Sequence, residues 1–251
     1  MKALIPILII FSFFMLNCSE LNQEKKELTK NETNDALKGD IVLERNPLWG
    51  QVSSIKEQVF TLEEKFGEYK RIGEVTTFTY KFNENVNLVE MVERTRDEYG
   101  SNYGSFKTTF KYNDLKKLIE ENYFELSGRF INKTIYKYDE IGNLIEEKRY
   151  NADGDLSNKR TYKYKNKGRE VKGVSISPTW PDGNSYRKFT CKYNNKGLLI
   201  EEKEYNTKGN LSETTTYKYN DFDETGNWIK QSVFINDKPR KIIEREIKYS
   251  N

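Results

Sequence analysis

The sequence predicts an all-β protein: a long antiparallel β-meander of repeated hairpins, twisted or curled into an open sheet, after a signal peptide and a polar tether. Three observations support this fold class. The 251 residues include 17 Tyr and 14 Phe, many at regular positions, whereas disordered chains are poor in aromatic residues. Glycines suited to tight turns recur at short intervals, 12 residues from Gly142 to Gly154 and 14 from Gly154 to Gly168. The segments between them are rich in Tyr, Thr, Ile and Val, which favour strands.

Residues 1–17 are expected to form the signal peptide. Lys2 precedes an apolar run over 3–16, which is too short to span a bilayer comfortably. The run ends in a stretch that resembles the lipobox of bacterial lipoproteins, although Asn17 stands where most lipoboxes have Gly, Ala or Ser. The resemblance implies cleavage before Cys18 and a diacylglycerol on its thiol. An ordinary secretory signal with an incidental cysteine, and a retained anchor helix, are the alternatives.

Residues 18–38 are expected to form a polar tether. They are rich in Glu, Lys, Asn and Thr and contain no proline. Two or more acyl chains hold a protein stably to a membrane, so the membrane is a partner through the N-terminal lipid. Ser19 stands where many lipoproteins retained in the inner membrane have Asp. The cell envelope is therefore the expected location, with the outer membrane favoured and the choice between periplasmic and surface exposure open.

Residues 39–251 are predicted to form the repeat sheet. Each unit has an aromatic-Lys-aromatic segment, a turn, a Leu-Ile pair and then charged residues, and regular self-similarity of this kind indicates a repeat architecture. The second aromatic of each unit recurs at steps of 30, 26, 26, 29, 26 and 30 residues, at Phe82, Tyr112, Tyr138, Tyr164, Tyr193, Tyr219 and Tyr249. Seven aromatic strands and the six strands that return between them give thirteen, and one or two more are expected from residues 51–79. Six glycines should lie in the turns: Gly142, Gly154, Gly168, Gly197, Gly209 and Gly226.

Both faces of each strand are mixed in character. Leu144 and Ile145 are neighbours and point to opposite faces, so both faces are apolar near the turn. The following residues 146–149 place charges on both faces mid-strand. A transmembrane barrel needs one uniformly apolar face, where a basic residue costs about 2–4 kcal/mol. The pattern therefore argues against a transmembrane barrel.

The segment 136–144, with Tyr138-Asp139 at its centre, resembles the YD repeat of the RHS family. The resemblance covers about residues 80–249 and implies a β-sheet shell. The chain departs from the pattern where Val86 and Lys116 replace the turn glycine. RHS proteins are much longer and enclose a toxin, so the resemblance implies a small relative that keeps the sheet and lacks the cargo.

The composition limits the kinds of catalysis and binding that the chain can support. The chain has no histidine, which removes the commonest general base and metal ligand, and we expect no metal and no cofactor. Its net charge is +3 with interleaved signs, unlike the basic patches of nucleic-acid-binding proteins, so no nucleic acid is expected. The adjacent carboxylates at 120–121, 146–147 and 201–202 should diverge and be solvated. Cys191 is expected to be a small hydrophobe in a strand.

Two loops are candidate partner-binding sites. Trp180 stands between two prolines in residues 177–184 and is expected at the tip of a protruding loop, with folding back onto the sheet edge as the alternative. Tyr103 belongs to a second, weaker candidate turn. The aromatic ladder is interpreted as cross-strand packing, with a carbohydrate platform as the alternative.

The sequence therefore predicts an envelope-anchored structural or binding module that is not an enzyme, with a protein or carbohydrate ligand. The alternative is a carboxylate-dependent enzyme acting on glycans. A deep cleft with two convergent carboxylates would favour the enzyme, and a continuous open sheet would favour the module.

Overall fold

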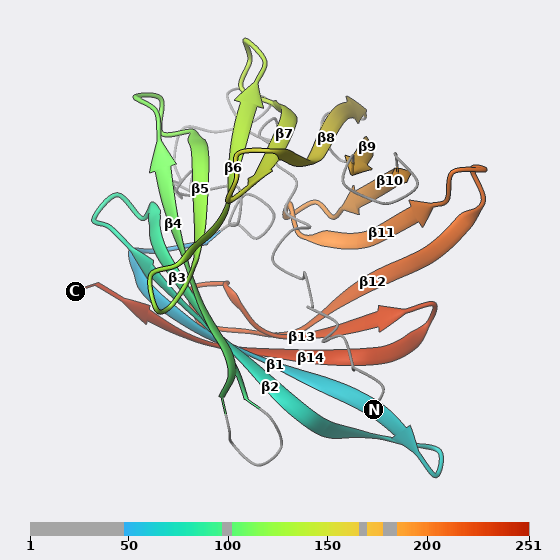
Figure 1. The fold of residues 1–251 in the computed structure, drawn as a ribbon. Helices are drawn as coiled ribbons and strands as arrows, with labels where there is room; N and C mark the ends of the chain where they lie inside the picture. The colour runs from blue at the N-terminus through green and yellow to red at the C-terminus, as the bar shows by residue number, and fades with distance from the viewer. Residues whose placement is uncertain (1–47, 97–101, 166–169, 178–184, 251) are drawn as a thin grey trace, which may run out of the picture.

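A computed structural model describes residues 48–96, 102–165, 170–177 and 185–250. They form fourteen antiparallel strands in one sheet (Figure 1). The strands are β1 (Val52–Lys65), β2 (Glu68–Phe82), β3 (Leu88–Arg96), β4 (Asn102–Tyr112), β5 (Leu118–Glu125), β6 (Phe130–Tyr138), β7 (Leu144–Asn151), β8 (Leu156–Lys165), β9 (Glu170–Ser177), β10 (Ser185–Tyr193), β11 (Leu199–Tyr205), β12 (Leu211–Phe222), β13 (Trp228–Ile235) and β14 (Lys238–Tyr249).

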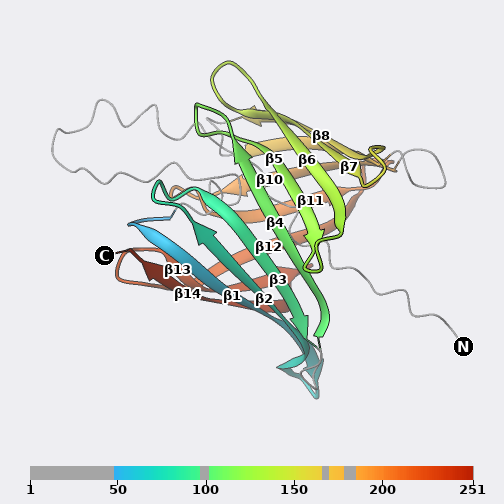
Figure 2. The same ribbon diagram turned by 60° about the vertical axis from the view of Figure 1, so that its left-hand side comes forward.

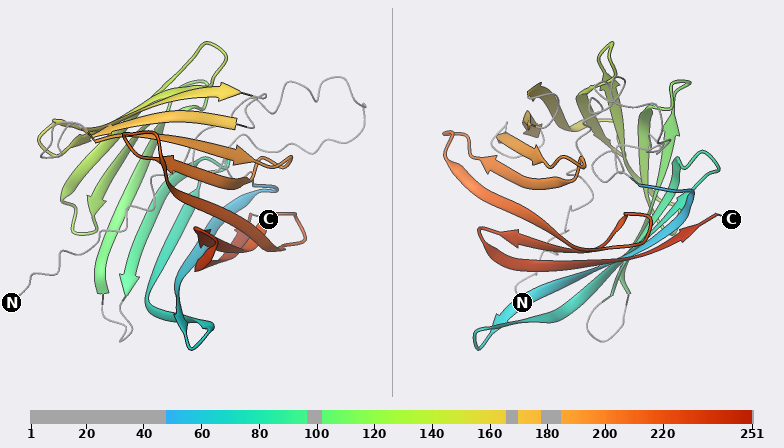
Figure 3. Two further views of the ribbon diagram at one scale, coloured as in Figure 1. Left: turned by 90° about the vertical axis from the view of Figure 1, so that its right-hand side faces the viewer. Right: turned by 180° about the vertical axis from the view of Figure 1, so that it is seen from behind.

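The sheet closes on itself to form a barrel, so the predicted open sheet is wrong. Every strand pairs with its neighbours in sequence, and β1 also pairs with β14 from Val52↔Tyr249 to Thr61↔Lys241. Blue β1 lies beside red β14 in all views (Figures 1 and 3). Closure leaves no unpaired sheet edge among the described strands, which removes a route to aggregation that an open meander would expose.

The hairpins run back and forth around the barrel wall (Figure 2). We call the end formed by turns 83–87, 113–117, 139–143, 194–198 and 223–227 the proximal end. Each of these turns opens with Asn or Asp, whose side-chain oxygen accepts backbone hydrogen bonds from the residues two and four positions later. Asp139 Oδ1, for example, accepts from Ile141 N at 3.2 Å and Asn143 N at 2.7 Å.

The fourth residue of each proximal turn has a left-handed backbone, which glycine adopts most easily. Gly142 has a φ of 92°, and the two non-glycine replacements adopt the same region, with φ of 57° at Val86 and 58° at Lys116. Five of the six glycines predicted in turns lie in turns, at 142, 154, 197, 209 and 226, and this prediction is confirmed. Gly168 lies outside the described residues.

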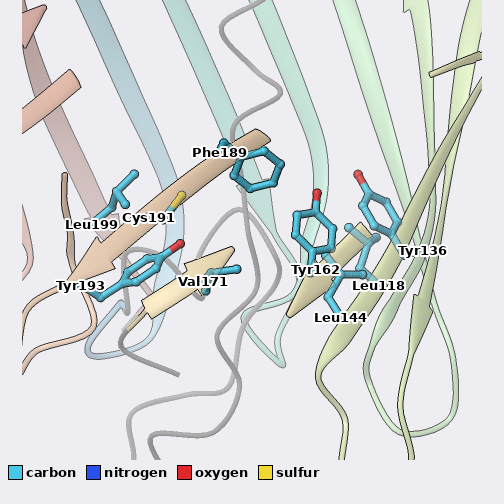
Figure 4. Packing of buried hydrophobic residues seen from close by; sticks show 9 residues of the cluster. All are labelled: Leu118, Tyr136, Leu144, Tyr162, Val171, Phe189, Cys191, Tyr193 and Leu199. Atoms are coloured by element: carbon cyan, nitrogen blue, oxygen red, sulfur yellow. The ribbon is translucent and has the colours of Figure 1, made fainter. Parts of the chain in front are cut away.

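Two clusters of buried residues form the core near the proximal end. The first gathers nine residues of β5 to β11 on one face of the wall (Figure 4). The second lies around β1, β2 and β3 and includes Leu48, which is buried just before the first strand. Because side chains crowd together on the concave face of a barrel, we take the face that carries both clusters as the inner face.

Hydrogen bonds between neighbouring units explain the spacing of the repeat. The second-aromatic tyrosine of one unit donates its hydroxyl to the backbone carbonyl of the leucine after the preceding proximal turn. These bonds are Tyr112 to Leu88 at 2.9 Å, Tyr138 to Leu118 at 2.8 Å, Tyr164 to Leu144 at 2.8 Å and Tyr219 to Leu199 at 3.0 Å. In these four units the aromatic ladder therefore joins the hairpin to the one before it.

Candidate functional site

The outer wall carries a lattice of cross-strand ion pairs. Glu90 binds both Lys81 and Lys107 at 2.8 Å, and Glu146 binds Lys148 at 3.0 Å and Lys159 at 2.7 Å. The same arrangement recurs where Glu120 binds Lys111 and where Glu201 binds Lys192 and Lys203. Hydrogen bonds from lysines hold the pKa of these four glutamates below its usual range. This face of the wall is therefore densely charged.

The inward member of each carboxylate pair is buried. Glu121, Glu147 and Glu202 are 9%, 8% and 5% exposed. Neighbouring carboxylates diverge to opposite faces as predicted, but the prediction that they are solvated is wrong for these three. The reason is closure, because a curled wall encloses the face that an open sheet would leave in water.

Tyrosines of the repeat lie beside these inner carboxylates. Tyr217 donates to Glu202 Oε2 at 3.4 Å, and Tyr80 donates to Glu57 Oε1 at 3.4 Å. Burial, followed by the charges of Glu121 and Glu147, raises the pKa of Tyr136 well above its usual value. The first aromatic of the motif thus serves as a hydrogen-bonding or electrostatic neighbour for the inner glutamates.

Strands β5 to β9 carry an inner polar patch built from two registered rows. The first row is Glu121, Thr134, Arg149 and Asn158, and the second is Tyr136, Glu147, Arg160 and Ser175. Asn158 donates to Ser175 Oγ at 3.1 Å and links the rows. Burial, and then the neighbouring charge of Arg160, lowers the pKa of Arg149 to about 10. The patch balances two guanidinium groups against two carboxylates.

A second buried charge pair lies at the seam between β1 and β14. Arg245 Nε donates to Glu57 Oε2 at 2.7 Å, and the two side chains are 6% and 9% exposed. The Arg245 guanidinium also lies 3.4 Å from the centre of the Trp228 ring. A cation stacked on an aromatic face and paired with a carboxylate is well stabilised away from water.

Apolar residues line part of the inner wall around the seam, together with Gln231 and Lys241. Gln231, Ile243 and Val59 lie in one registered row, and Val233 and Phe78 are buried nearby on the same face. Lys241, opposite Val233, has its pKa lowered to about 8 by burial. The inner face therefore carries apolar residues such as Val59 and Ile243 near the seam and the inner polar patch on β5 to β9.

Arginine charges lie beside three of the inner carboxylates. Glu121 and Glu147 both interact with Arg149, and Glu57 is bound by Arg245. Glu93, opposite Phe78 on the inner face, differs from them, because burial raises its pKa to about 7. No cluster of potential metal ligands occurs in the part of the chain that the structure describes.

The residues singled out from the sequence have different outcomes. Cys18 and Trp180 lie outside the described residues. Tyr103 lies within β4, at an irregularity in its pairing with β3, rather than in a free-standing turn. Cys191 is 1% exposed in the first core cluster, which confirms the prediction of a buried small hydrophobe. Sequence reasoning missed Phe66, which is fully exposed at the tip of the β1–β2 hairpin.

The described residues include no long apolar helix of the kind that crosses a membrane. No family model matches the chain, and no curated protein matches it either. The resemblance to RHS repeats is therefore wrong: the repeat encodes the hairpins of a closed barrel rather than an RHS shell.

Among solved structures, the chain is similar to a porin-like protein from Bacteroides uniformis, with a TM-score of 0.51, 14% identity, and coverage of 78% of this chain and 96% of that one. A weaker similarity is to a LolA superfamily protein from Nitrosomonas europaea, with a TM-score of 0.32, 9% identity, and coverage of 83% of this chain and 90% of that one. Another is to a DUF1329 family protein from Desulfovibrio piger, with a TM-score of 0.33, 10% identity, and coverage of 80% of this chain and 86% of that one. The first similarity concerns the fold alone: this chain and that protein share an antiparallel β-barrel.

Proposed function

We propose that this chain is a lipid-anchored binding protein of the cell envelope that takes an amphiphilic ligand against the inner face of its barrel. The observation that carries the proposal is the contrast between the two faces of the wall. The outer face is a lattice of ion-paired Lys and Glu, whereas the inner face carries apolar residues near the seam and the inner polar patch on β5 to β9.

The number of strands in the barrel leaves room for a ligand inside it. Side chains fill the interior of barrels of about eight strands, whereas barrels of about sixteen leave an open channel. A barrel of fourteen strands is closer to the second case. An amphiphile fits such an interior because its chain can lie along Val59 and Ile243 while its polar group faces Arg149 and Arg160.

The chemistry of the outer face favours a barrel surrounded by water. Each basic residue on a lipid-facing wall costs about 2–4 kcal/mol near the bilayer centre, and lysines recur on the outer face of several strands. We propose instead that the membrane is reached through the lipid on Cys18. In this account residues 1–17 are the signal peptide, 18–38 the tether and 39–251 the barrel domain.

Binding is tested by calorimetric titration of the mature chain carrying Cys18→Ser with lysophosphatidylcholine below its micelle-forming concentration. Ile242 and Ile243 offer a matched pair, because they are neighbours on β14 and point to opposite faces. We expect saturable binding that weakens at least tenfold in Ile243→Glu and stays unchanged in Ile242→Glu. Absence of binding, or equal loss in both variants, would contradict an inner site.

The anchor is tested separately by the mass of the N-terminal peptide and by partitioning into a detergent phase. We expect a diacylglycerol on Cys18 and loss of partitioning in Cys18→Ala. A Cys18→Ala protein that is cleaved normally and still partitions with membranes would refute lipidation without bearing on the barrel's ligand.

A further inference from the structure

The outer wall has a depression of about 320 Å³ over the seam where the barrel closes. It is lined by residues of β14, β1 and β2: Ser54, Ile55, Lys56, Thr79, Glu246 and Lys248. The exposed residues Lys56, Glu246 and Lys248 alternate with Ile55 and Ile247, which belong to or pack against the second core cluster. The depression therefore opens on the outer face, separate from the inner wall.

A break in the strand pairing accompanies the depression. The register between β1 and β14 shifts between Val52 and Ser54, so one extra residue enters β1 at this point. The hydroxyl of that residue, Ser53, donates to the Lys248 carbonyl at 3.1 Å. A bulge re-aims the neighbouring side chains and interrupts the regular ladder.

The two lysines of the depression differ from the lysines that form the outer lattice of ion pairs. Elsewhere lysines such as Lys81, Lys111 and Lys192 each bind a glutamate within 3 Å. Across the described residues, Lys56 and Lys248 have no ion pair, although Lys56 is the direct register partner of Glu246. Two lysines without an acidic partner and two hydroxyl groups, from Ser54 and Thr79, thus line one hollow.

We infer that this hollow binds a phosphate group. Lysine ammonium groups act as point charges for phosphate, and hydroxyl groups donate hydrogen bonds to its oxygens. Lys248 is the register partner of Ser54, and Lys56 is the register partner of Thr79, so each lysine has a hydroxyl on the adjacent strand. Glu246 accepts a hydrogen bond from a hydroxyl or amine of the ligand next to the phosphate. The ligand class is a phosphate ester with such a donor, either a soluble ester or a lipid head group.

The test uses the mature lipidated protein in neutral detergent, titrated with glycerol 1-phosphate in a calorimeter. A second arm measures binding of the mature chain carrying Cys18→Ser, which has no lipid of its own, to vesicles of phosphatidylglycerol. We expect Lys56→Gln/Lys248→Gln to weaken binding at least tenfold. The matched control is Lys137→Gln/Lys218→Gln, which removes the same charge at lysines of β6 and β12 outside the hollow.

If the soluble ester binds, and Lys56→Gln/Lys248→Gln abolishes this binding while the control variant keeps it, the result supports a site for soluble phosphate esters. Binding to the vesicles alone, with the same dependence on Lys56 and Lys248, supports a head-group site. Absence of binding in both arms, or equal loss in the control, overturns the inference, because net charge then accounts for any effect.

Discussion

The hydroxyl of Tyr138 donates a hydrogen bond of 2.8 Å to the backbone carbonyl of Leu118, twenty residues earlier. Tyr138 ends β6, and Leu118 begins β5 after the preceding proximal turn. The same bond recurs in three other units, so it explains why the second aromatic of the repeat is so often tyrosine.

Tyr138→Phe should lower the free energy of unfolding by about 1 kcal/mol, because it leaves a carbonyl without its partner while keeping the ring in place. Urea unfolding measures the change. Tyr150→Phe is the control, since the Tyr150 ring lies under Lys133 and no hydrogen bond of its hydroxyl is found in the described structure. Equal effects in the two variants would show that the hydroxyl of Tyr138 has no special role.

Replacing a non-glycine turn residue by glycine should stabilise the barrel, and replacing a turn glycine by alanine should destabilise it. Lys116 has a φ of 58°, a conformation that costs an L-residue about 1–2 kcal/mol. Lys116→Gly should therefore raise the free energy of unfolding by about 0.5–1 kcal/mol, after the entropic cost of glycine. Gly142→Ala should lower it by about 1 kcal/mol, because the φ there is 92°. A destabilised Lys116→Gly protein would contradict the turn geometry.

Stability should fall as pH rises through the range in which Glu93 titrates. Burial raises the pKa of Glu93 from 4.5 to about 7, although a hydrogen bond from Tyr123 partly opposes the shift. Between these two values the folded barrel binds the proton and the unfolded chain does not, so unfolding becomes easier as pH increases.

The loss contributed by Glu93 is at most about 3 kcal/mol, at roughly 1.4 kcal/mol for each pH unit. Glu93→Gln should flatten the dependence of the free energy of unfolding on pH between 4.5 and 7, measured by urea titration at several pH values. A profile for Glu93→Gln that matches the unmodified chain would assign the dependence to other groups.

Much of the local structure could be predicted from the sequence. Gly142 and its equivalents mark turns because a left-handed backbone has a strong residue preference, and the aromatic segments mark strands. Val86 and Lys116 depart from that preference and still turn, because Asn83 and Asn113 accept the backbone hydrogen bonds that fix the turn.

Closure of the barrel could not be predicted in the same way. It depends on β1 pairing with β14, for example Glu57 with Arg245, residues 188 positions apart with no local signal to join them. The burial of Glu121 and Glu147 follows from that closure, since the sequence pattern of a charged strand is the same on an open sheet and inside a barrel. The inner polar patch was missed for this reason.

The most direct test of an inner binding face is photo-crosslinking with a lysophosphatidylcholine that carries a diazirine in its acyl chain, followed by mapping of the labelled peptides. The account predicts saturable labelling at Val59 and Ile243, which unlabelled lysophosphatidylcholine suppresses. Labelling confined to the outward-facing neighbours Phe60 and Ile242, or labelling that does not saturate, would contradict it.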